Sequence, residues 1–159
     1  MAAARIREMF EKGTRAFNTH DIEAMGELLH DDCEVNSPGF EVQGQQAVKA
    51  FYRGWIDAFP DARVEVDRVT CTDDQAIEEG VFTGTHRGTL RGPGGDIPAT
   101  GRRVRVAYIQ IARYRGEKVA AFHLMFDRLE MLEQLGLTRS ESEAPRQAAD
   151  TGQGAGLAH

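Results

Sequence analysis

The sequence predicts an α+β domain in which helices pack on the concave face of a curved antiparallel sheet and enclose a ligand cavity. Apolar residues recur at helical spacing through most of residues 5–59, and alternating, strand-like segments fill residues 62–127. A short helical pattern then closes the domain at residues 128–136. Glycines interrupt one of the long strands, which indicates bends or bulges that would curl the sheet into a cone.

Three helices are expected before the long strands. The first covers residues 5–17, and the polar segment 18–21 ends it and caps a second helix at residues 22–30. Residues 44–59 form the third helix, whose broad apolar stripe is expected to face the core. Pro60 ends that helix, because proline cannot continue the backbone hydrogen bonding.

The expected strands differ in length. Two short extended pieces flank a Ser-Pro-Gly turn at residues 37–39, and four long strands follow at residues 62–72, 76–90, 102–115 and 118–127. Residues 91–101 are expected to form a loop. Gly136 is expected to end the closing helix in the left-handed conformation that glycine adopts easily.

The composition fits one globular domain. The chain has 159 residues, of which 41% are hydrophobic and 28% are charged. The domain is expected to span residues 3–137, followed by a disordered tail at 138–159 that is rich in Ala, Gly, Ser and Gln. Cys33 and Cys71 lack the spacing of a disulfide framework and are expected to be reduced thiols.

Charge and motifs exclude several classes of function. The net charge of −6 argues against nucleic-acid binding, which needs a basic surface. The sequence has no metal-ligand spacing, so no metal is expected, and it contains neither a phosphate loop nor a dinucleotide fingerprint. Without an apolar leader or a run long enough to span a bilayer, the protein is expected to be cytoplasmic and to have no membrane partner.

The first candidate for catalysis is the acid that follows the last strand. Asp127 comes after an apolar run whose one other polar residue is His123, and the two share a face of the strand. Asp127 is either the acid/base group of an active site or the N-cap of the helix that begins at Arg128. His123 is either a pocket residue or a core histidine that hydrogen-bonds to the backbone.

The other candidates would bind the substrate. Tyr108 and Gln110 share the face of strand 102–115 that is expected to line the cavity, where they could donate hydrogen bonds to a carbonyl oxygen. The opposite face, an apolar centre between arginines, is a candidate homodimer interface. For each remaining candidate a core or turn role is the alternative; these are His86, Trp55, Tyr52, Phe59 and Asn36.

Several segments, taken in order, resemble the SnoaL-like polyketide cyclase family. Residues 84–88 read Gly-Thr-His-Arg-Gly and residues 98–102 read Pro-Ala-Thr-Gly-Arg. The strand that finishes in Asp127 is followed by a helix that closes on Gln-Leu-Gly at residues 134–136. The resemblance covers nearly all of residues 5–137.

The resemblance implies a cone fold of the ketosteroid-isomerase or nuclear-transport-factor-2-like type, usually dimeric. It implies an intramolecular aldol condensation of a polyketide-like substrate, as in antibiotic biosynthesis, with Asp127 as acid/base and no cofactor. The implied partner is a small apolar ligand that contains a carbonyl group. Two alternatives stay open: epoxide opening by paired acids, with Glu78 or Glu79 beside Asp127, and a domain that binds a small molecule without catalysis.

Overall fold

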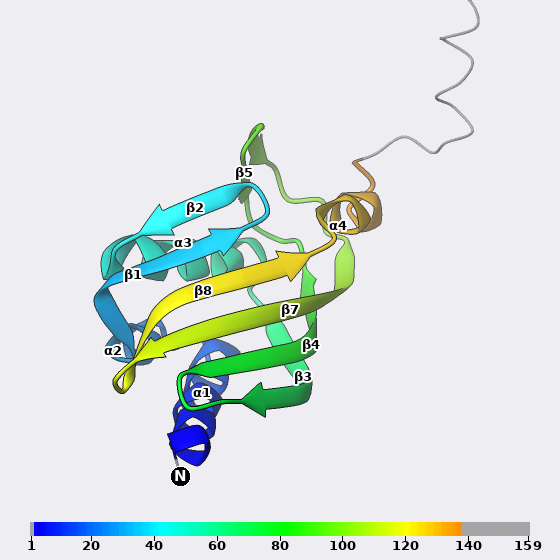
Figure 1. Cartoon of the computed structure of the whole chain (residues 1–159). Helices are drawn as coiled ribbons and strands as arrows, with labels where there is room; N and C mark the ends of the chain where they lie inside the picture. Colours follow the sequence, from blue (N-terminus) through cyan, green and yellow to red (C-terminus); the bar gives the residue numbers. More distant parts are fainter. Residues whose placement is uncertain (1, 138–159) are drawn as a thin grey trace, which may run out of the picture.

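The computed structural model describes residues 2–137, which contain four helices and eight strands (Figure 1). The helices are α1 (Ala2–Asn18), α2 (Ile22–Glu27), α3 (Gln45–Ala58) and α4 (Arg128–Gln134). The strands are β1 (Leu29–Ser37), β2 (Phe40–Gln43), β3 (Arg63–Cys71), β4 (Gln75–Thr85), β5 (Leu90–Gly92), β6 (Gly95–Ile97), β7 (Arg103–Arg115) and β8 (Lys118–Phe126). The tail expected at residues 138–159 lies outside the described residues.

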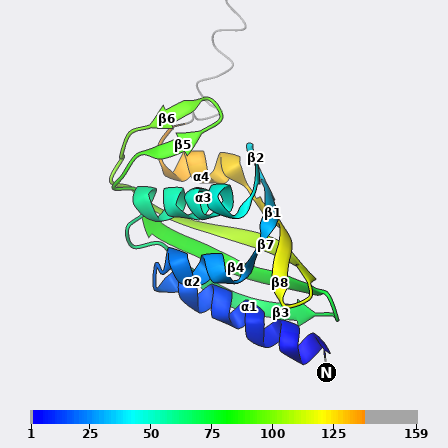
Figure 2. The ribbon, with the colours of Figure 1, turned by 90° about the vertical axis from the view of Figure 1, so that its left-hand side faces the viewer.

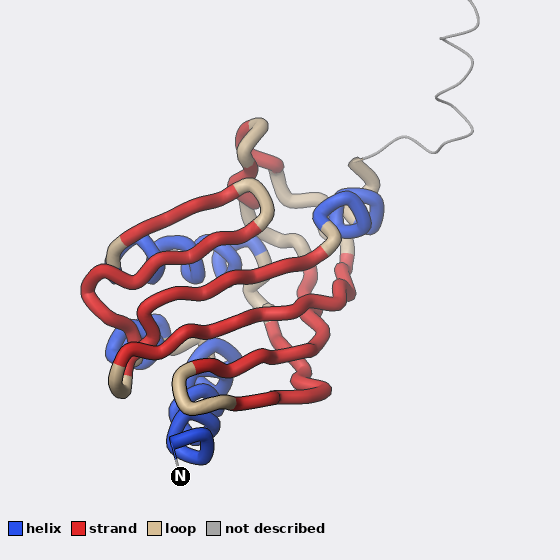
Figure 3. Tube along the Cα trace, in the orientation of Figure 1, coloured by secondary structure: helices blue, strands red, loops and turns tan. Residues whose placement is uncertain are grey.

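Six of the strands form one curved sheet in the order β2-β1-β8-β7-β4-β3 (Figure 3). The sheet is mixed, because β1 runs parallel to β8 while the other neighbours pair antiparallel. The expectation of a purely antiparallel sheet is therefore wrong at this pairing. The long stretch of chain between β1 and β8 allows it, since parallel neighbours need a long connection.

Two elements, the second helix and the segment 91–101, differ from what the sequence predicts. The second helix ends at Glu27, and Leu29 already belongs to β1, so the helix is shorter than predicted. Residues 91–101, expected as a loop, contribute instead to a small hairpin in which β5 pairs with β6. At the other end of the chain, Gly136 has a φ of 76°, as predicted for a residue that ends a helix.

Irregular registers bend the strands of the sheet, and one glycine permits a close approach on its concave face. The strand pairings of β1 with β8, β3 with β4 and β7 with β8 each contain a register shift, which bends a strand locally. At Gly80 of β4, an added Cβ would lie 2.6 Å from the Glu65 carbonyl oxygen and 2.8 Å from the Tyr108 hydroxyl. Glycine is therefore required at this point of the concave face.

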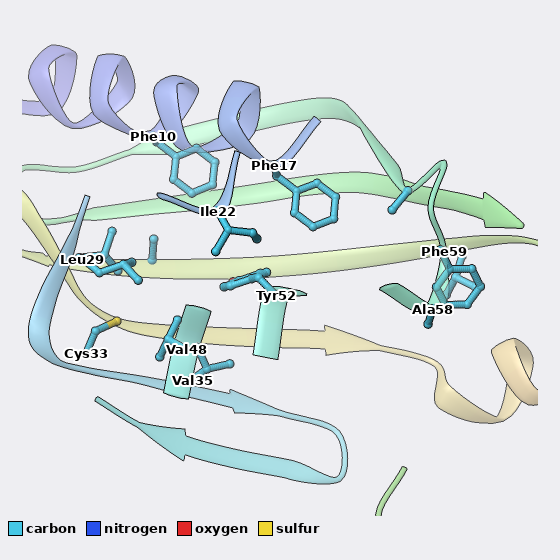
Figure 4. Packing of buried hydrophobic residues seen from close by; sticks show 14 of the residues in the cluster. Phe10, Phe17, Ile22, Leu29, Cys33, Val35, Val48, Tyr52, Ala58 and Phe59 are labelled. Atoms are coloured by element: carbon cyan, nitrogen blue, oxygen red, sulfur yellow. The ribbon is translucent and has the colours of Figure 1, made fainter. Parts of the chain in front are cut away.

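Helices α1, α2 and α3 lie on the same side of the sheet (Figure 2). Their apolar faces and the concave face of the sheet form one hydrophobic core. Figure 4 shows how Phe10 and Phe17 of α1 and Val48 and Tyr52 of α3 converge on this core. Of the helices within residues 2–137, none is long and apolar enough to cross a membrane.

Candidate active site

A cavity of about 110 Å³ lies between the concave face of the sheet and the helices. Most of its lining is aliphatic or aromatic, with contributions from α1, α2, α3, β4, β7 and β8. The polar side chains in the lining are Thr14, Tyr52, Glu78, Tyr108, Gln110 and Tyr114. The cavity is thus an apolar chamber with a small group of hydrogen-bonding side chains, the usual composition of a ligand site.

Glu78 of β4 is the acid in this chamber. The residue is 3% exposed, and it is the one buried carboxylic acid within residues 2–137. The Tyr108 hydroxyl donates a hydrogen bond to Oε1 of Glu78, and the Thr14 hydroxyl lies 3.2 Å from Oε2. Burial raises the pKa of Glu78, while the hydrogen bonds from Tyr108 and Thr14 act in the opposite direction.

A second hydrogen bond joins the neighbouring side chains. Gln110 lies opposite Glu78 in the register of β4 and β7, and its Oε1 accepts a hydrogen bond of 3.2 Å from the Tyr52 hydroxyl. Burial raises the pKa of both Tyr52 and Tyr108, so each tyrosine stays a neutral donor. The site therefore combines one titratable acid with neutral hydrogen-bonding groups.

We expect the stability of the protein to report the raised pKa of Glu78. The neutral carboxyl is favoured in the fold, so its stabilising contribution is complete below the unfolded-state pKa near 4.5 and is lost as pH rises through the higher folded-state pKa. Glu78→Gln removes this titration. Urea unfolding of both proteins should be measured from about pH 4 to about pH 8. As pH rises over this range, the free energy of unfolding of the variant should increase relative to that of the wild type. A difference that is independent of pH would contradict the raised pKa.

Asp127 lies outside the chamber. It is exposed, and it is the N-cap of α4, where its Oδ1 accepts a hydrogen bond of 3.0 Å from the Glu130 backbone N–H. Asp127 is therefore not placed in the cavity, the position that its interpretation as the acid/base group of an active site requires. The geometry matches the alternative interpretation of Asp127 as a helix cap.

Replacing the cap should have a modest effect on stability. We expect Asp127→Ala to lower the free energy of unfolding by about 1 kcal/mol, because the α4 N-terminus loses its side-chain acceptor. Asp127→Asn should stay within a few tenths of a kcal/mol of the wild type, since asparagine caps about as well as aspartate. Chemical denaturation measures both values, and an equal loss in the two variants would argue against the cap.

His123 and Asn36 also lie elsewhere. They are register partners on β8 and β1, and both project from the outer face of the sheet. The cavity is lined instead by Phe122, Leu124 and Phe126, the alternate residues of β8. The physical reason is that the more apolar of the two strand faces turns inward.

Phe59 and His86 are buried in the core and do not line the chamber. Their rings lie 5.4 Å apart, and Nδ1 of His86 accepts a hydrogen bond of 3.2 Å from the Thr100 backbone N–H. The backbone of His86 also bonds to Arg102 and Gly101. The two motifs at residues 84–88 and 98–102 thus join the chain on either side of the β5–β6 hairpin. Burial lowers the pKa of His86, which favours the neutral ring.

Of the substrate-binding candidates, Tyr52, Trp55, Tyr108 and Gln110 line the cavity together. Glu78 was expected only as an alternative partner of Asp127, and its central position in the cavity was not predicted from the sequence. Strand alternation supplies part of the missing signal, because Ala76, Glu78, Gly80 and Phe82 share one face of β4. Thr14 had no signal in the sequence, because its contact with Glu78 depends on how α1 packs against β4.

The model of the SnoaL-like polyketide cyclase family matches residues 6–135 of the chain. The protein belongs to this family. A search of curated protein sequences finds no match. Within residues 2–137, no group of three or more His, Cys, Asp or Glu side chains could hold a metal ion in this family member.

Solved structures share the fold of this SnoaL-like protein. TsrD from Streptomyces laurentii has 26% identity and a TM-score of 0.74, with 85% of this chain and 97% of TsrD covered. A candidate SnoaL-like polyketide cyclase from Jannaschia sp. CCS1 has 18% identity and a TM-score of 0.77, over 86% of this chain and 95% of that one. A protein with a ketosteroid isomerase-like fold from Catenulispora acidiphila, in complex with trimethylamine, has 16% identity and a TM-score of 0.69, over 82% and 94%. The expected cone fold is confirmed.

Proposed function

We propose that this SnoaL-like protein is a cofactor-independent enzyme that moves a proton at a carbon next to a carbonyl group, with Glu78 as the acid/base. The observation that carries the proposal is the position of Glu78, the one buried carboxylic acid within residues 2–137, in a chamber whose lining is mostly apolar. Loss of hydration raises the pKa of such a group and makes its carboxylate a stronger base. Ketosteroid isomerase, a known example, also uses a carboxylate base in an apolar site.

The hydrogen bonds around Glu78 are compatible with this role. A carboxylate has about four acceptor positions, and Tyr108 and Thr14 use two of them, so acceptor capacity remains for a substrate proton. The amide N–H group of Gln110 is a neutral donor that can stabilise the enolate oxygen, while the hydroxyls of Tyr52 and Tyr108 hold Gln110 and Glu78 in place through the hydrogen bonds that they donate. In an aldol ring closure, the enolate carbon bonds to a second carbonyl carbon of the substrate, and protonated Glu78 returns its proton to the resulting alkoxide.

The dimensions of the chamber favour a small apolar carbonyl compound, or one end of a larger polyketide-like substrate. The volume of about 110 Å³ is below that of typical drug-sized pockets, which begin at about 300 Å³. Apolar side chains dominate the lining, so the binding energy would come mainly from hydrophobic contact.

The two alternative functions differ in their support. Epoxide opening needs a second acid, but Glu79 pairs with Arg68 at 3.6 Å on the outer side and Asp127 is exposed. Within residues 2–137 the cavity lining contains no acid besides Glu78, so we do not favour that reaction. A binding domain without catalysis is the second candidate, and the observation that favours it is that both oxygens of Glu78 already accept hydrogen bonds from the protein.

Hydrogen–deuterium exchange at carbon distinguishes catalysis from binding. The protein, freed of metal by chelation, is incubated in D2O with acetophenone, 1-indanone or cyclohexanone, and exchange next to the carbonyl is followed by proton NMR. We expect exchange above the buffer rate for at least one ketone. Calorimetry run in parallel detects binding, so a ketone that binds without exchanging would support the binding domain.

We also propose that the protein forms a homodimer through the outer face of the sheet. Ile109 and Met125 are 46% and 53% exposed there and are register neighbours on β7 and β8, with Arg105 and Arg113 on either side. Sedimentation velocity should give twice the chain mass, and Met125→Asp should lower it towards that of the monomer. A wild-type monomer at about 100 μM would contradict this proposal.

The cytoplasmic location stays a prediction.

A further inference from the structure

A second hollow, of about 320 Å³, lies beyond the chamber that contains Glu78. Its walls come from the β1–β2 turn, β2, α3, β5, the end of β8 and α4, and we call it the outer groove. Aromatic and aliphatic side chains form most of its surface, among them Phe40, Phe51, Trp55, Phe126, Leu90 and Met131. A groove with this lining favours an apolar ligand or the apolar part of a larger one.

Two arginines also line the outer groove. Arg91 is exposed on β5, and Arg128 is half-buried at the start of α4. The Arg128 guanidinium reaches across to the hairpin, where its Nη2 would lie 3.1 Å from a Cβ added to Gly92. The groove thus has positive charge contributed from two separate elements, although the whole chain has a net charge of −6.

Within residues 2–137, no ion pair neutralises the charge of either arginine. The ion pairs among residues 2–137 include other arginines, such as Arg105 and Arg115, but neither Arg91 nor Arg128. Asp127 is adjacent to Arg128 in the chain, and Asp96 is the register partner of Arg91 across the hairpin. Neither acid forms an ion pair with Arg91 or Arg128 in this part of the chain.

We propose that the outer groove binds an apolar compound that ends in a carboxylate. The aromatic wall would hold the alkyl or aryl body, and Arg91 and Arg128 would hold the carboxylate, for which guanidinium is a geometrically matched donor. This combination of charge and apolar surface is complementary to an organic acid and not to a neutral compound. The inference goes beyond the proposed function and does not depend on the role of Glu78.

Trp55 offers a direct signal for this binding. It is the single tryptophan of the chain, and its side chain lines both the outer groove and the inner chamber. Phe126 is likewise shared, and its ring centroid lies 5.7 Å from that of Trp55. A ligand in the outer groove would therefore change the fluorescence of Trp55.

The test compares decanoate, decanol and decyl phosphate below their micelle concentrations, by Trp55 fluorescence and by calorimetry. We expect decanoate to bind about tenfold or more tightly than decanol, because the charged hydrogen bonds exist for the acid alone. The double variant Arg91→Gln/Arg128→Gln should lose that preference and keep its affinity for decanol, which also shows that the groove is folded. Arg63→Gln, which removes an exposed arginine outside the groove, should bind decanoate like the wild type.

Three results would overturn the proposal. These are equal affinities of the wild type for decanoate and decanol, an unchanged preference in the double variant, and binding of decyl phosphate about tenfold tighter than decanoate, which would assign the site to a phosphate instead. The Glu78→Gln variant should bind decanoate as the wild type does. Decanoate binding would therefore persist if Glu78 were not the acid/base group. A loss of the decanoate preference would likewise leave the assignment of Glu78 unchanged.

Discussion

The Glu78→Gln variant is expected to fold normally and to lose about 10²–10⁴-fold of the catalysed exchange rate. Glutamine has nearly the same shape: its oxygen can accept from one of the two hydroxyls and its NH2 group can donate to the oxygen of the other, but it cannot take a proton from carbon. The measurement is the exchange rate constant of the ketone identified with the wild type, with the melting temperature recorded for both proteins. A variant that retains more than about a tenth of the wild-type rate would contradict the assignment of Glu78.

Two acids outside the chamber provide matched controls. Glu79→Gln removes the adjacent carboxylate of β4, which lies on the outer side and pairs with Arg68, and Asp127→Asn removes the charge of the α4 cap. Both variants should exchange within about twofold of the wild type. If Asp127→Asn abolished exchange and Glu78→Gln did not, the acid/base group would be Asp127, as the family resemblance implies.

Phe59→Ala is expected to lower the free energy of unfolding by about 3–5 kcal/mol, the range for deleting a fully buried aromatic side chain. Phe59 is 0% exposed, and its ring stacks on Trp55 and meets Phe82 edge-on at 5.4 Å. Alanine would leave a void beneath Trp55, which belongs to the wall of both hollows. Urea denaturation gives the loss, and the emission of Trp55 in the folded state should shift with it.

Leu129→Ala is the control for this substitution. Leu129 is 58% exposed on α4, so its truncation should change the free energy of unfolding by less than about 0.5 kcal/mol. A loss of less than about 1.5 kcal/mol for Phe59→Ala would mean that the core around Phe59 closes over the void. The packing of Phe59 against Trp55 and Phe82 would then contribute little to the stability of the fold.

Most of the fold could be predicted from the sequence because it depends on local patterns. Helical spacing located α1 and α3, alternation located β7 and β8, and Gly136 marked the end of α4. The parallel pairing of β1 with β8 could not be predicted in this way, because it joins strands that are distant in the sequence. The β5–β6 hairpin has strands of three residues each, too short for an alternating pattern to be recognised.

The site was predicted less well because a strand has two faces, and the face that turns inward must be inferred from which of the two is more apolar. For β7 the face with Tyr108 and Gln110 was assigned to the cavity, and these residues line it. For β8 the face with His123 was preferred over the more apolar face with Phe122, and this choice was wrong. Hydrophobic burial would have assigned β8 correctly, and the register of β7 with β4 would then have placed Glu78 inside.

The close approach at Gly80 has a consequence for directed evolution. A side chain at this position would meet the Glu65 carbonyl, which belongs to the backbone, and the Tyr108 hydroxyl, which hydrogen-bonds to Glu78. A library that seeks room for bulkier substrates should therefore vary Phe10 or Met25 on the helical wall and keep position 80 unchanged. Substitution of Gly80 would displace the Tyr108 hydroxyl from Glu78 and would not enlarge the cavity.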